Sequence, residues 1–328
     1  MSQGSLYRRT TGLFLATALL FALSVPAFAF FRRDTAQTGE ENLPIAENLS
    51  ITTYKNVAVI GSFAGMSPKG EVLTFRVVKN PARGKVTLSE AEASRFTYTP
   101  YEDKTGKDAF TYVAETSDGK VSQPAEGSIR IEKPDTKVNY GDMAGHPAHK
   151  AAIALAEEEI FVGEKMGATW FFRPDTPVTR EEFLAMAMDV VEMETLPEAV
   201  STGFSDDGCI SVWAKPYVAS ALRSGVVQGS DDGAEGVAFS PEQPITRTEA
   251  AVLLNRLLGV SDVAARGNLA DDAAPAWAYQ SVVNLEAVGV LQADETGYLD
   301  LGGELTRGEA AELLLSAMEV LDFRERIW

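Results

Sequence analysis

Several residue types are scarce in the 328-residue sequence, and each shortage excludes a class of site. A single cysteine, Cys209, rules out a disulfide within the chain. The two histidines, His146 and His149, have Pro147 between them and no third histidine to complete a metal site, so no metal ligands are predicted. Nucleophile elbows, phosphate-binding glycine loops and recognisable Ser/His/Asp sets are also lacking, so the sequence nominates no catalytic residue and no cofactor.

Positive charge is scarce as well. Lys and Arg number 29 against 47 Asp and Glu, which gives a formal net charge of −18. A chain this acidic is repelled by nucleic acid and by anionic membrane or wall polymers. Nucleic acid is therefore excluded as a partner, and an anionic ligand must be held by individual cationic side chains.

The apolar run of residues 13–23 is too short to span a membrane stably. Arg8-Arg9 precedes it and Ala27-Phe28-Ala29 follows it, which is the pattern of an export signal. We expect residues 1–29 to be a signal peptide of the general secretory route, because the residues after Arg9 fit a twin-arginine signal poorly. Residues 30–42 are expected to be a linker, and no membrane span is expected after cleavage. An exported chain without disulfides suits the surface of a Gram-positive bacterium.

Residues 43–133 predict an all-β antiparallel sandwich. Short runs of β-branched and aromatic residues alternate with turn signals such as Ser117-Asp118-Gly119. Short strands at this spacing, with no helical stretch between them, are typical of a two-sheet sandwich. The predicted strands are residues 72–78, 85–88, 96–99, 110–113 and 129–131.

Two segments, Phe96-Thr97-Tyr98-Thr99-Pro100 and Asp108-Ala109-Phe110-Thr111-Tyr112, give this region its family resemblance. In order and spacing the region resembles bacterial immunoglobulin-like and cadherin-like surface modules. Members of that group often bind calcium through an Asn-Asp pair near the first strand, which Ala46-Glu47-Asn48 lacks, so calcium is not carried over. Asp103, Asp108 and Asp118 are interpreted as turn residues.

From residue 140 onward the sequence contains an internal repeat with a helical period. A linker at 134–139 is followed by units at 140–200, 201–264 and 265–322. The second unit is the clearest: Phe204-Ser205-Asp206, Trp213-Ala214, Gly225-Val226-Val227-Gln228-Gly229 and Thr246-Arg247-Thr248-Glu249 follow in that order. Each unit is expected to be a helix, a long loop and a second helix. Neither helix can bury its apolar face alone, so the three units should stack about a common axis.

This order of motifs resembles the S-layer homology domain in its three-copy form. The resemblance implies an all-α half of helix-loop-helix repeats arranged as a pseudo-threefold spindle. It also implies a repeat region that attaches to secondary cell-wall polysaccharide, an anionic polymer often bearing ketal-linked pyruvate, through clefts between repeats.

The motif Thr-Arg-x-Glu has a structural explanation for two of its residues. A threonine followed three residues later by glutamate, just before an apolar helical run, is a capping box that satisfies free amides at the helix start. The predicted pairs are Thr179 with Glu182, Thr246 with Glu249, and Thr306 with Glu309.

The arginine of the motif needs a different explanation. Arg180, Arg247 and Arg307 fall at the first helical position, where the helix dipole disfavours a cation by roughly 0.3–1 kcal/mol. One compensating partner would be an acid elsewhere in the fold. The candidate acids are Asp142, Asp206 and Asp271. The other would be an anionic ligand, since helix amides and a guanidinium together suit a carboxylate or phosphate. The family resemblance favours the ligand, with the arginine pairing the pyruvate carboxylate.

Trp213 and Trp277 start helices and suit either a saccharide face or the core of the spindle. The first unit has Pro147 in place of the tryptophan and Glu159 in place of the glycine found in the other units. Its cleft at Arg180 is therefore the weakest candidate for a binding site, and the cleft at Arg247 is the strongest. The candidate polysaccharide-binding residues are Arg180, Arg247, Arg307, Thr179, Thr246, Thr306, Glu182, Glu249, Glu309, Trp213, Trp277, Asp206 and Asp271.

The sequence therefore predicts a secreted, non-catalytic protein of the cell wall or S-layer surface. The repeats serve as a non-covalent anchor, and the sandwich serves as a spacer or as an interaction module for other surface proteins. One alternative is a surface enzyme or wall-remodelling factor acting on peptidoglycan or glycan, which would release wall fragments into solution. Another keeps the fold but directs the repeats to peptidoglycan or to an outer-membrane-linked polymer.

Overall fold

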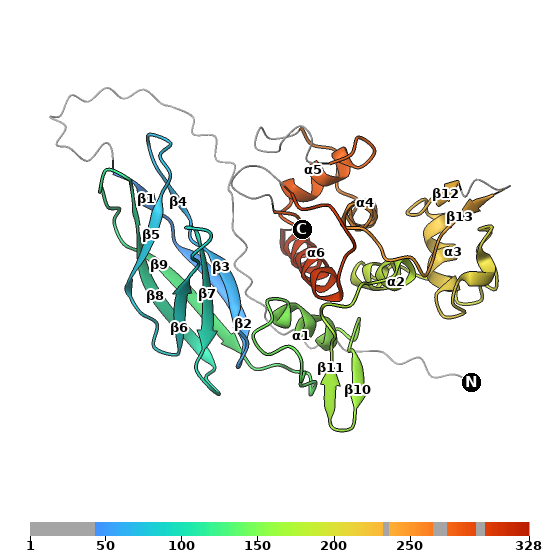
Figure 1. Cartoon of the computed structure of the whole chain (residues 1–328), viewed down its shortest axis with the longest axis horizontal. Helices are drawn as coiled ribbons and strands as arrows, with labels where there is room; N and C mark the ends of the chain where they lie inside the picture. The colour runs from blue at the N-terminus through green and yellow to red at the C-terminus, as the bar shows by residue number, and fades with distance from the viewer. Residues whose placement is uncertain (1–42, 232–235, 265–273, 293–298, 328) are drawn as a thin grey trace.

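The computed structural model describes residues 43–231, 236–264, 274–292 and 299–327. The expected signal peptide and the linker at 30–42 lie outside this part of the chain. The strands of residues 45–132 gather on one side of the molecule and the helices on the other (Figure 1). Among the described residues, no helix is long and apolar enough to cross a membrane.

The amino-terminal half is a sandwich of two main sheets. The larger sheet has the order β2 (Leu49–Tyr54), β9 (Ala125–Glu132), β8 (Gly106–Glu115) and β5 (Thr74–Lys79). The smaller has the order β3 (Val59–Ser62), β7 (Arg95–Pro100) and β6 (Gly84–Leu88), and β1 (Ile45–Ala46) pairs with β4 (Gly65–Met66). Alternate residues of the strands point inward and form a core of large aromatic rings, as the period of two predicts. The buried rings are Phe63, Phe96, Tyr98, Phe110 and Tyr112.

One strand pair differs from the antiparallel prediction. Strand β2 runs parallel to β9, with Leu49 opposite Gly127 and Tyr54 opposite Glu132. Both strands end on the side where the helical half lies, so the first and last long strands of the sandwich leave in the same direction (Figure 1). After β2 the chain reverses through Asn56, whose φ of 64° lies in the left-handed region that asparagine tolerates.

The sandwich is joined to the helical half by more than the linker. Tyr54 and Val57, at the turn after β2, are buried within the core cluster of the helices. The Tyr54 hydroxyl donates to Glu157 at 2.6 Å, and the Asp135 amide donates to the other oxygen of the same carboxylate at 2.6 Å. Burial, together with the neighbouring Glu157, raises the pKa of Tyr54 well above its usual range. The turn after β2 is therefore a structural part of the helical core.

The helical half contains a helix pair for each expected repeat. The pairs are α1 (His149–Glu157) with α2 (Arg180–Val190), α3 (Lys215–Arg223) with α4 (Arg247–Leu258), and α5 (Tyr279–Ala287) with α6 (Arg307–Ile327). A short 3-10 turn, Asp207–Cys209, precedes α3.

The all-α prediction missed two β-hairpins inside the loops. Strand β10 (Glu164–Met166) pairs with β11 (Thr169–Phe171), and β12 (Ser230–Asp231) pairs with β13 (Val237–Ala238). These strands are only two or three residues long, so an alternating pattern had no room to show in the sequence. Gly167 turns the first hairpin with a φ of 65°, which glycine adopts without strain.

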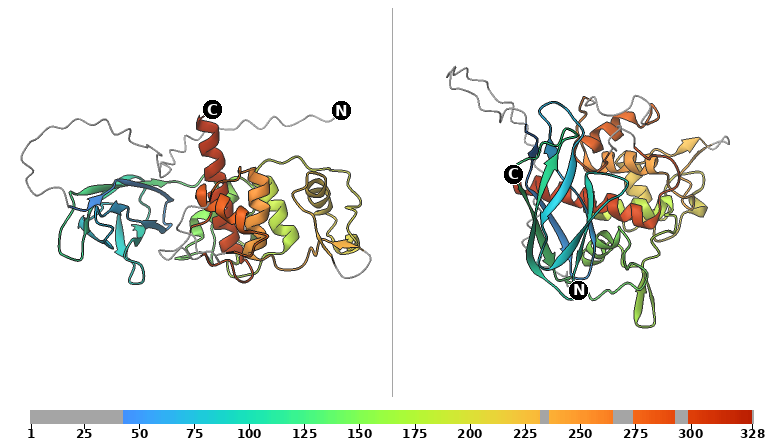
Figure 2. Two further views of the ribbon diagram at one scale, coloured as in Figure 1. Left: turned by 90° about the horizontal axis from the view of Figure 1, so that it is seen from above. Right: turned by 60° about the vertical axis from the view of Figure 1, so that its left-hand side comes forward.

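Each second helix packs on the first helix of the following unit. Helix α2 contacts α3, α4 contacts α5, and α6 returns to contact α1, while α2, α4 and α6 also contact one another (Figure 2). Their shared core is built mostly from alanine, leucine and valine side chains. The last helix of the chain thus lies beside the first helix of the repeat region, and the order of contacts closes on itself.

Candidate functional site

The three Thr-Arg-x-Glu motifs start α2, α4 and α6, and all three form the predicted capping box. In α2 the Glu182 amide donates to the Thr179 hydroxyl at 3.3 Å, and the Thr179 amide donates back to the Glu182 carboxylate at 3.0 Å. The same two bonds are present at Thr246 with Glu249 and at Thr306 with Glu309. Each helix begins at its arginine, as predicted.

A ring of backbone hydrogen bonds brings the three motifs together. The residue before each threonine takes part: Val178 donates to the Leu305 carbonyl at 3.0 Å, Leu305 donates to Ile245 at 2.8 Å, and Ile245 donates to Val178 at 2.9 Å. All three side chains are buried. Because this ring fixes the helix starts around one centre, each arginine extends across a seam toward the next unit.

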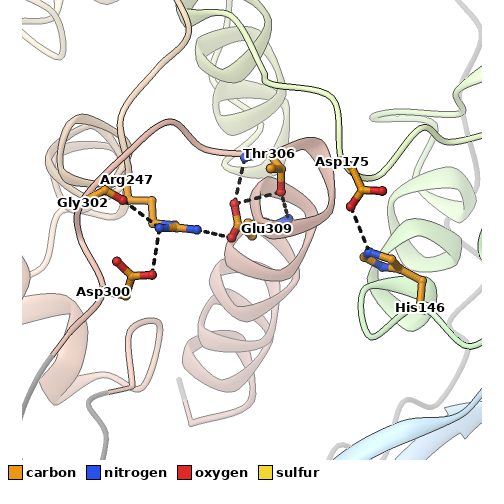
Figure 3. A network of polar contacts seen from close by, with 7 residues as sticks. All are labelled: His146, Asp175, Arg247, Asp300, Gly302, Thr306 and Glu309. Atoms are coloured by element: carbon orange, nitrogen blue, oxygen red, sulfur yellow. Dashed lines mark hydrogen bonds and ion pairs between the residues drawn. The ribbon is translucent and has the colours of Figure 1, made fainter.

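Two of the arginines pair with glutamates of the neighbouring capping box. Arg180 Nη1 lies 2.8 Å from Glu249 Oε1, and its Nε donates to the Phe239 carbonyl at 2.9 Å. Arg247 Nη2 contacts Glu309, and its Nη1 lies 3.0 Å from Asp300 Oδ2 (Figure 3). Each of these glutamates therefore both caps its own helix and neutralises the preceding unit's arginine.

Glu309 shows how strongly these contacts favour the charged form. Burial alone would raise its pKa, but hydrogen bonds from the Thr306 amide and from Arg247 outweigh burial. The net result is a pKa of Glu309 below the usual range. The carboxylate is thus held as an anion by the helix start and by the guanidinium together.

The third arginine lacks such a partner. Arg307 Nη1 donates to the Phe172 carbonyl at 3.0 Å, and its Cζ lies 5.0 Å from the centre of the Phe161 ring. Among the described residues, no carboxylate oxygen lies within 4.0 Å of Arg307. Within that part of the chain, the guanidinium at the seam between the last unit and the first is therefore not paired with an acid.

The aspartates considered as arginine partners have another role. Asp142 accepts hydrogen bonds from the amides of Phe172 and Arg173, at 3.0 and 2.7 Å, and Asp206 does the same for Phe239 and Ser240. Both residues thereby fix the loop before the second helix of their unit. The hypothesis that they pair with the arginines is wrong, and Asp271 lies outside the described residues.

Both tryptophans of the repeats lie at the surface. Trp213 is 51% exposed and Trp277 is 63% exposed, whereas Ala214 and Ala278 directly after them are fully buried. Of the two interpretations, packing in the core is therefore excluded. An exposed indole face remains available for an apolar surface such as that of a sugar ring.

The two histidines lie at the start of α1, one before the helix and one at its first residue. His146 Nε2 is 3.9 Å from an oxygen of Asp175, and its Nδ1 accepts from the Ala148 amide (Figure 3). Burial and the neighbouring His146 lower the pKa of His149. Within the part of the chain that the structure describes, no group of three or more His, Cys, Asp and Glu side chains is placed to hold a metal ion.

Sequence reasoning missed two polar contacts at the seams. Glu181, only 6% exposed, accepts from both the amide and the hydroxyl of Ser211, at 3.1 and 2.6 Å. Asp300, which pairs with Arg247, was also not singled out. A charged residue inside an otherwise buried helix face is the signal that points to Glu181. No local pattern marks Asp300, which comes from a loop.

Comparison with known families agrees with this architecture. A family model for a bacterial Ig domain matches residues 41–131, and one for the S-layer homology domain matches residues 139–184 and 204–251. The chain therefore contains a bacterial Ig domain followed by S-layer homology domains. The two S-layer homology matches cover the first two units, including the helix starts at Arg180 and Arg247.

Curated relatives share part of this chain. It is 33% identical over 122 residues to the surface-layer 125 kDa protein of Lysinibacillus sphaericus, covering 37% of this chain and 10% of that protein. It is 40% identical over 89 residues to an amylopullulanase of Thermoanaerobacterium thermosulfurigenes, covering 26% of this chain and 5% of the enzyme. It is 29% identical over 129 residues to cell surface glycoprotein 1 of Acetivibrio thermocellus, covering 36% and 5%. The chain thus spans a tenth or less of these relatives, and what they share with it is the S-layer homology region, an anchoring rather than a catalytic module.

Proposed function

We propose that this chain is a non-catalytic surface protein held on the cell wall by three repeats, 140–200, 201–264 and 265–322, that form a pseudo-threefold spindle. The closed order of helix contacts and the ring of hydrogen bonds through Val178, Ile245 and Leu305 support the threefold arrangement. The third unit is included because Thr306 and Glu309 repeat the capping contacts of the first two. The relatives named as surface-layer and cell-surface proteins support the location.

The ligand of the spindle is an anionic secondary cell-wall polysaccharide, with pyruvylated sugar as its acidic group. One observation carries this assignment: the Thr-Arg-x-Glu motif places an arginine at a helix start on each seam between two units, so a guanidinium is available where side chains of two units meet. The exposed Trp213 and Trp277 add apolar surfaces suited to sugar rings. The sandwich serves as a spacer or as a contact for other surface proteins.

The test is co-sedimentation of residues 30–328 with wall sacculi from the producing bacterium, before and after removal of the secondary polysaccharide. We expect binding to the intact sacculi and its loss after stripping. The matched control is the triple variant Arg180→Gln/Arg247→Gln/Arg307→Gln, which should not sediment with either. Equal binding of the wild type to stripped walls would direct the proposal to peptidoglycan instead.

The supernatant of the same experiment tests the enzymatic alternative. A wall-remodelling factor would release soluble sugar or peptide fragments from the sacculi, whereas an anchor leaves them intact. We expect no release above the level of the triple variant. Fragments that appear with time in the presence of the wild type would contradict the non-catalytic assignment.

A further inference from the structure

The three seams between units differ in how the motif arginine is neutralised. At the seam between the first and second units, Arg180 is paired with Glu249. At the seam between the second and third, Arg247 is paired with both Glu309 and Asp300. An external anion at either arginine has to displace a carboxylate that the fold already holds in place. Displacement of this kind reduces affinity, because part of the interaction is lost when the ligand binds.

At the seam between the third and first units, the equivalent acid makes no such pair. Glu182, the counterpart of Glu249 and Glu309, contacts its own Thr179 through one carboxylate oxygen. Arg307 uses Nη1 for the Phe172 carbonyl and rests against the Phe161 ring. In the described part of the chain, the edge formed by its Nε and Nη2 has no acceptor. That edge is the one that binds a carboxylate through two parallel hydrogen bonds.

The surroundings of Arg307 also lack the acid that serves Arg247. The loop position occupied by Asp300 in the third unit is Arg173 in the first, where it lies 2.7 Å from Glu164. On the other side, His146 packs against Gly308, where an added Cβ would lie 3.0 Å from its ring. The loop at this seam therefore has a basic residue, Arg173, where the loop beside Arg247 has the acidic Asp300. The contacts to Phe172 and Phe161 hold the Arg307 guanidinium in place before a ligand arrives.

We propose that Arg307 is the residue that binds the acidic group of the wall polymer, a carboxylate held bidentately on the Nε–Nη2 edge, and that Arg180 and Arg247 are internal ion pairs. This inference rests on the proposed function and narrows it to one seam. It reverses the expectation from the sequence, which ranked Arg247 first. A cation at a helix start is disfavoured by the dipole, and Arg307 is the motif arginine that no acid of the described chain pairs with, so a bound anion would offset that cost.

The experiment measures affinity for intact sacculi with three variants of residues 30–328. Arg307→Gln removes the open guanidinium. Arg180→Gln/Glu249→Gln and Arg247→Gln/Glu309→Gln remove the two closed pairs, and glutamine preserves the capping boxes. We expect Arg307→Gln to raise Kd at least about tenfold, the loss expected for a charge-assisted hydrogen-bonded contact. The two paired variants should stay within about threefold of the wild type.

Two further arms keep the result interpretable. Arg307→Lys retains the charge but not the bidentate edge, so it should bind more weakly than the wild type even if Arg307→Gln folds poorly. Sacculi whose carboxylates have been converted to amides should bind the wild type no better than they bind Arg307→Gln. Retained binding to amidated sacculi would overturn the carboxylate assignment.

Failure of this inference and failure of the proposed function give different results. If the wild type binds intact sacculi and an Arg180 or Arg247 pair variant loses that binding while Arg307→Gln keeps it, the assignment to Arg307 is wrong and the anchor stands. If the wild type does not bind intact sacculi, the anchor itself is wrong.

Discussion

The sandwich and the helical half complete their hydrophobic cores in different ways. The sandwich closes around a cluster of large rings, and Phe110 alone contacts Phe63, Phe96 and Tyr112. The core of the helical half consists mostly of aliphatic side chains, and its sequence of helix contacts closes only when α6 packs against α1. The sandwich thus completes its core locally, whereas the helical half depends on contacts between the two ends of its own sequence.

The difference also explains where charged side chains lie. Within the sandwich the ion pairs, such as Lys55 with Asp103, lie at the surface, where such pairs contribute little. In the helical half the ion pairs of Arg180 and Arg247 lie partly buried in seams between units. A fold made of separate units creates seams, and seams are where a ligand can meet side chains from two units at once. We therefore place binding in the helical half and a supporting role in the sandwich.

Removing the third unit tests whether the helical half depends on contacts between its two ends. We expect it to have the largest effect of the variants considered. Residues 30–264 lack α5 and α6, so α1 loses its packing partner and the ring loses Leu305. We expect the helices to lose cooperative unfolding while the sandwich keeps its own transition. Differential scanning calorimetry with circular dichroism at 222 nm would show this. A truncated chain that retains both transitions would show that each helix pair is stable by itself.

Phe110→Ala tests the comparison from the other side. Phe110 is fully buried among aromatic rings, so its truncation should cost the sandwich about 3–5 kcal/mol of unfolding free energy. The transition of the helical half should move much less. Leu254→Ala, at a fully buried position of α4, is the matched control and should affect the helical transition instead. Equal shifts in both transitions for either variant would mean that the two halves unfold as one unit.

The inequality of the seams predicts a smaller effect. Glu249→Gln keeps the cap but leaves Arg180 without an acid, so we expect a loss of about 1.5 kcal/mol, typical of a hydrogen bond to a charged group. Glu182→Gln at the equivalent position removes no ion pair and should change the helical transition by less than about 0.5 kcal/mol. Chemical denaturation of the two variants side by side would measure the difference. Similar losses for both would show that the seams are equivalent.

The smallest expected effect is a pH dependence at Glu309. Its pKa is lower in the folded chain than its usual value of 4.5, so the ionised form stabilises the fold. This stabilisation is fully present above that value and is lost as the pH falls through the lower folded pKa. The helical transition of Glu309→Gln should therefore fall less than that of the wild type between about pH 6 and pH 3. Parallel curves for the two proteins would contradict the lowered pKa.

Local features of the fold were predictable from the sequence, and non-local ones were not. The capping boxes at Thr179, Thr246 and Thr306 involve residues three positions apart, so the motif itself predicts them. The partner of Arg180 is Glu249, 69 positions further along, and only the closure of the units brings the two together. The parallel pairing of β2 with β9 is non-local in the same way.

The exposure of side chains near the seams could not be predicted from the sequence either. A tryptophan at a helix start fits a core and a surface equally well, and only the packing of Ala214 beneath it places Trp213 outside. Arg307 differs from the other two arginines because no acid of the described residues pairs with it at its seam. The repeat pattern is the same for all three motifs and therefore cannot predict this difference.

The return of α6 to α1 has a mechanical consequence. The sandwich is attached at α1, where the hydroxyl of Tyr54 meets Glu157, and α1 is packed along the final helix of the chain. A pull on the sandwich, such as drag on a protein standing off a surface, is therefore delivered to the first and last units at the same time. The α1–α6 contact thus lies on the path of that load. The closed ring therefore couples the first and last units when the sandwich is pulled, although they lie at opposite ends of the repeat sequence.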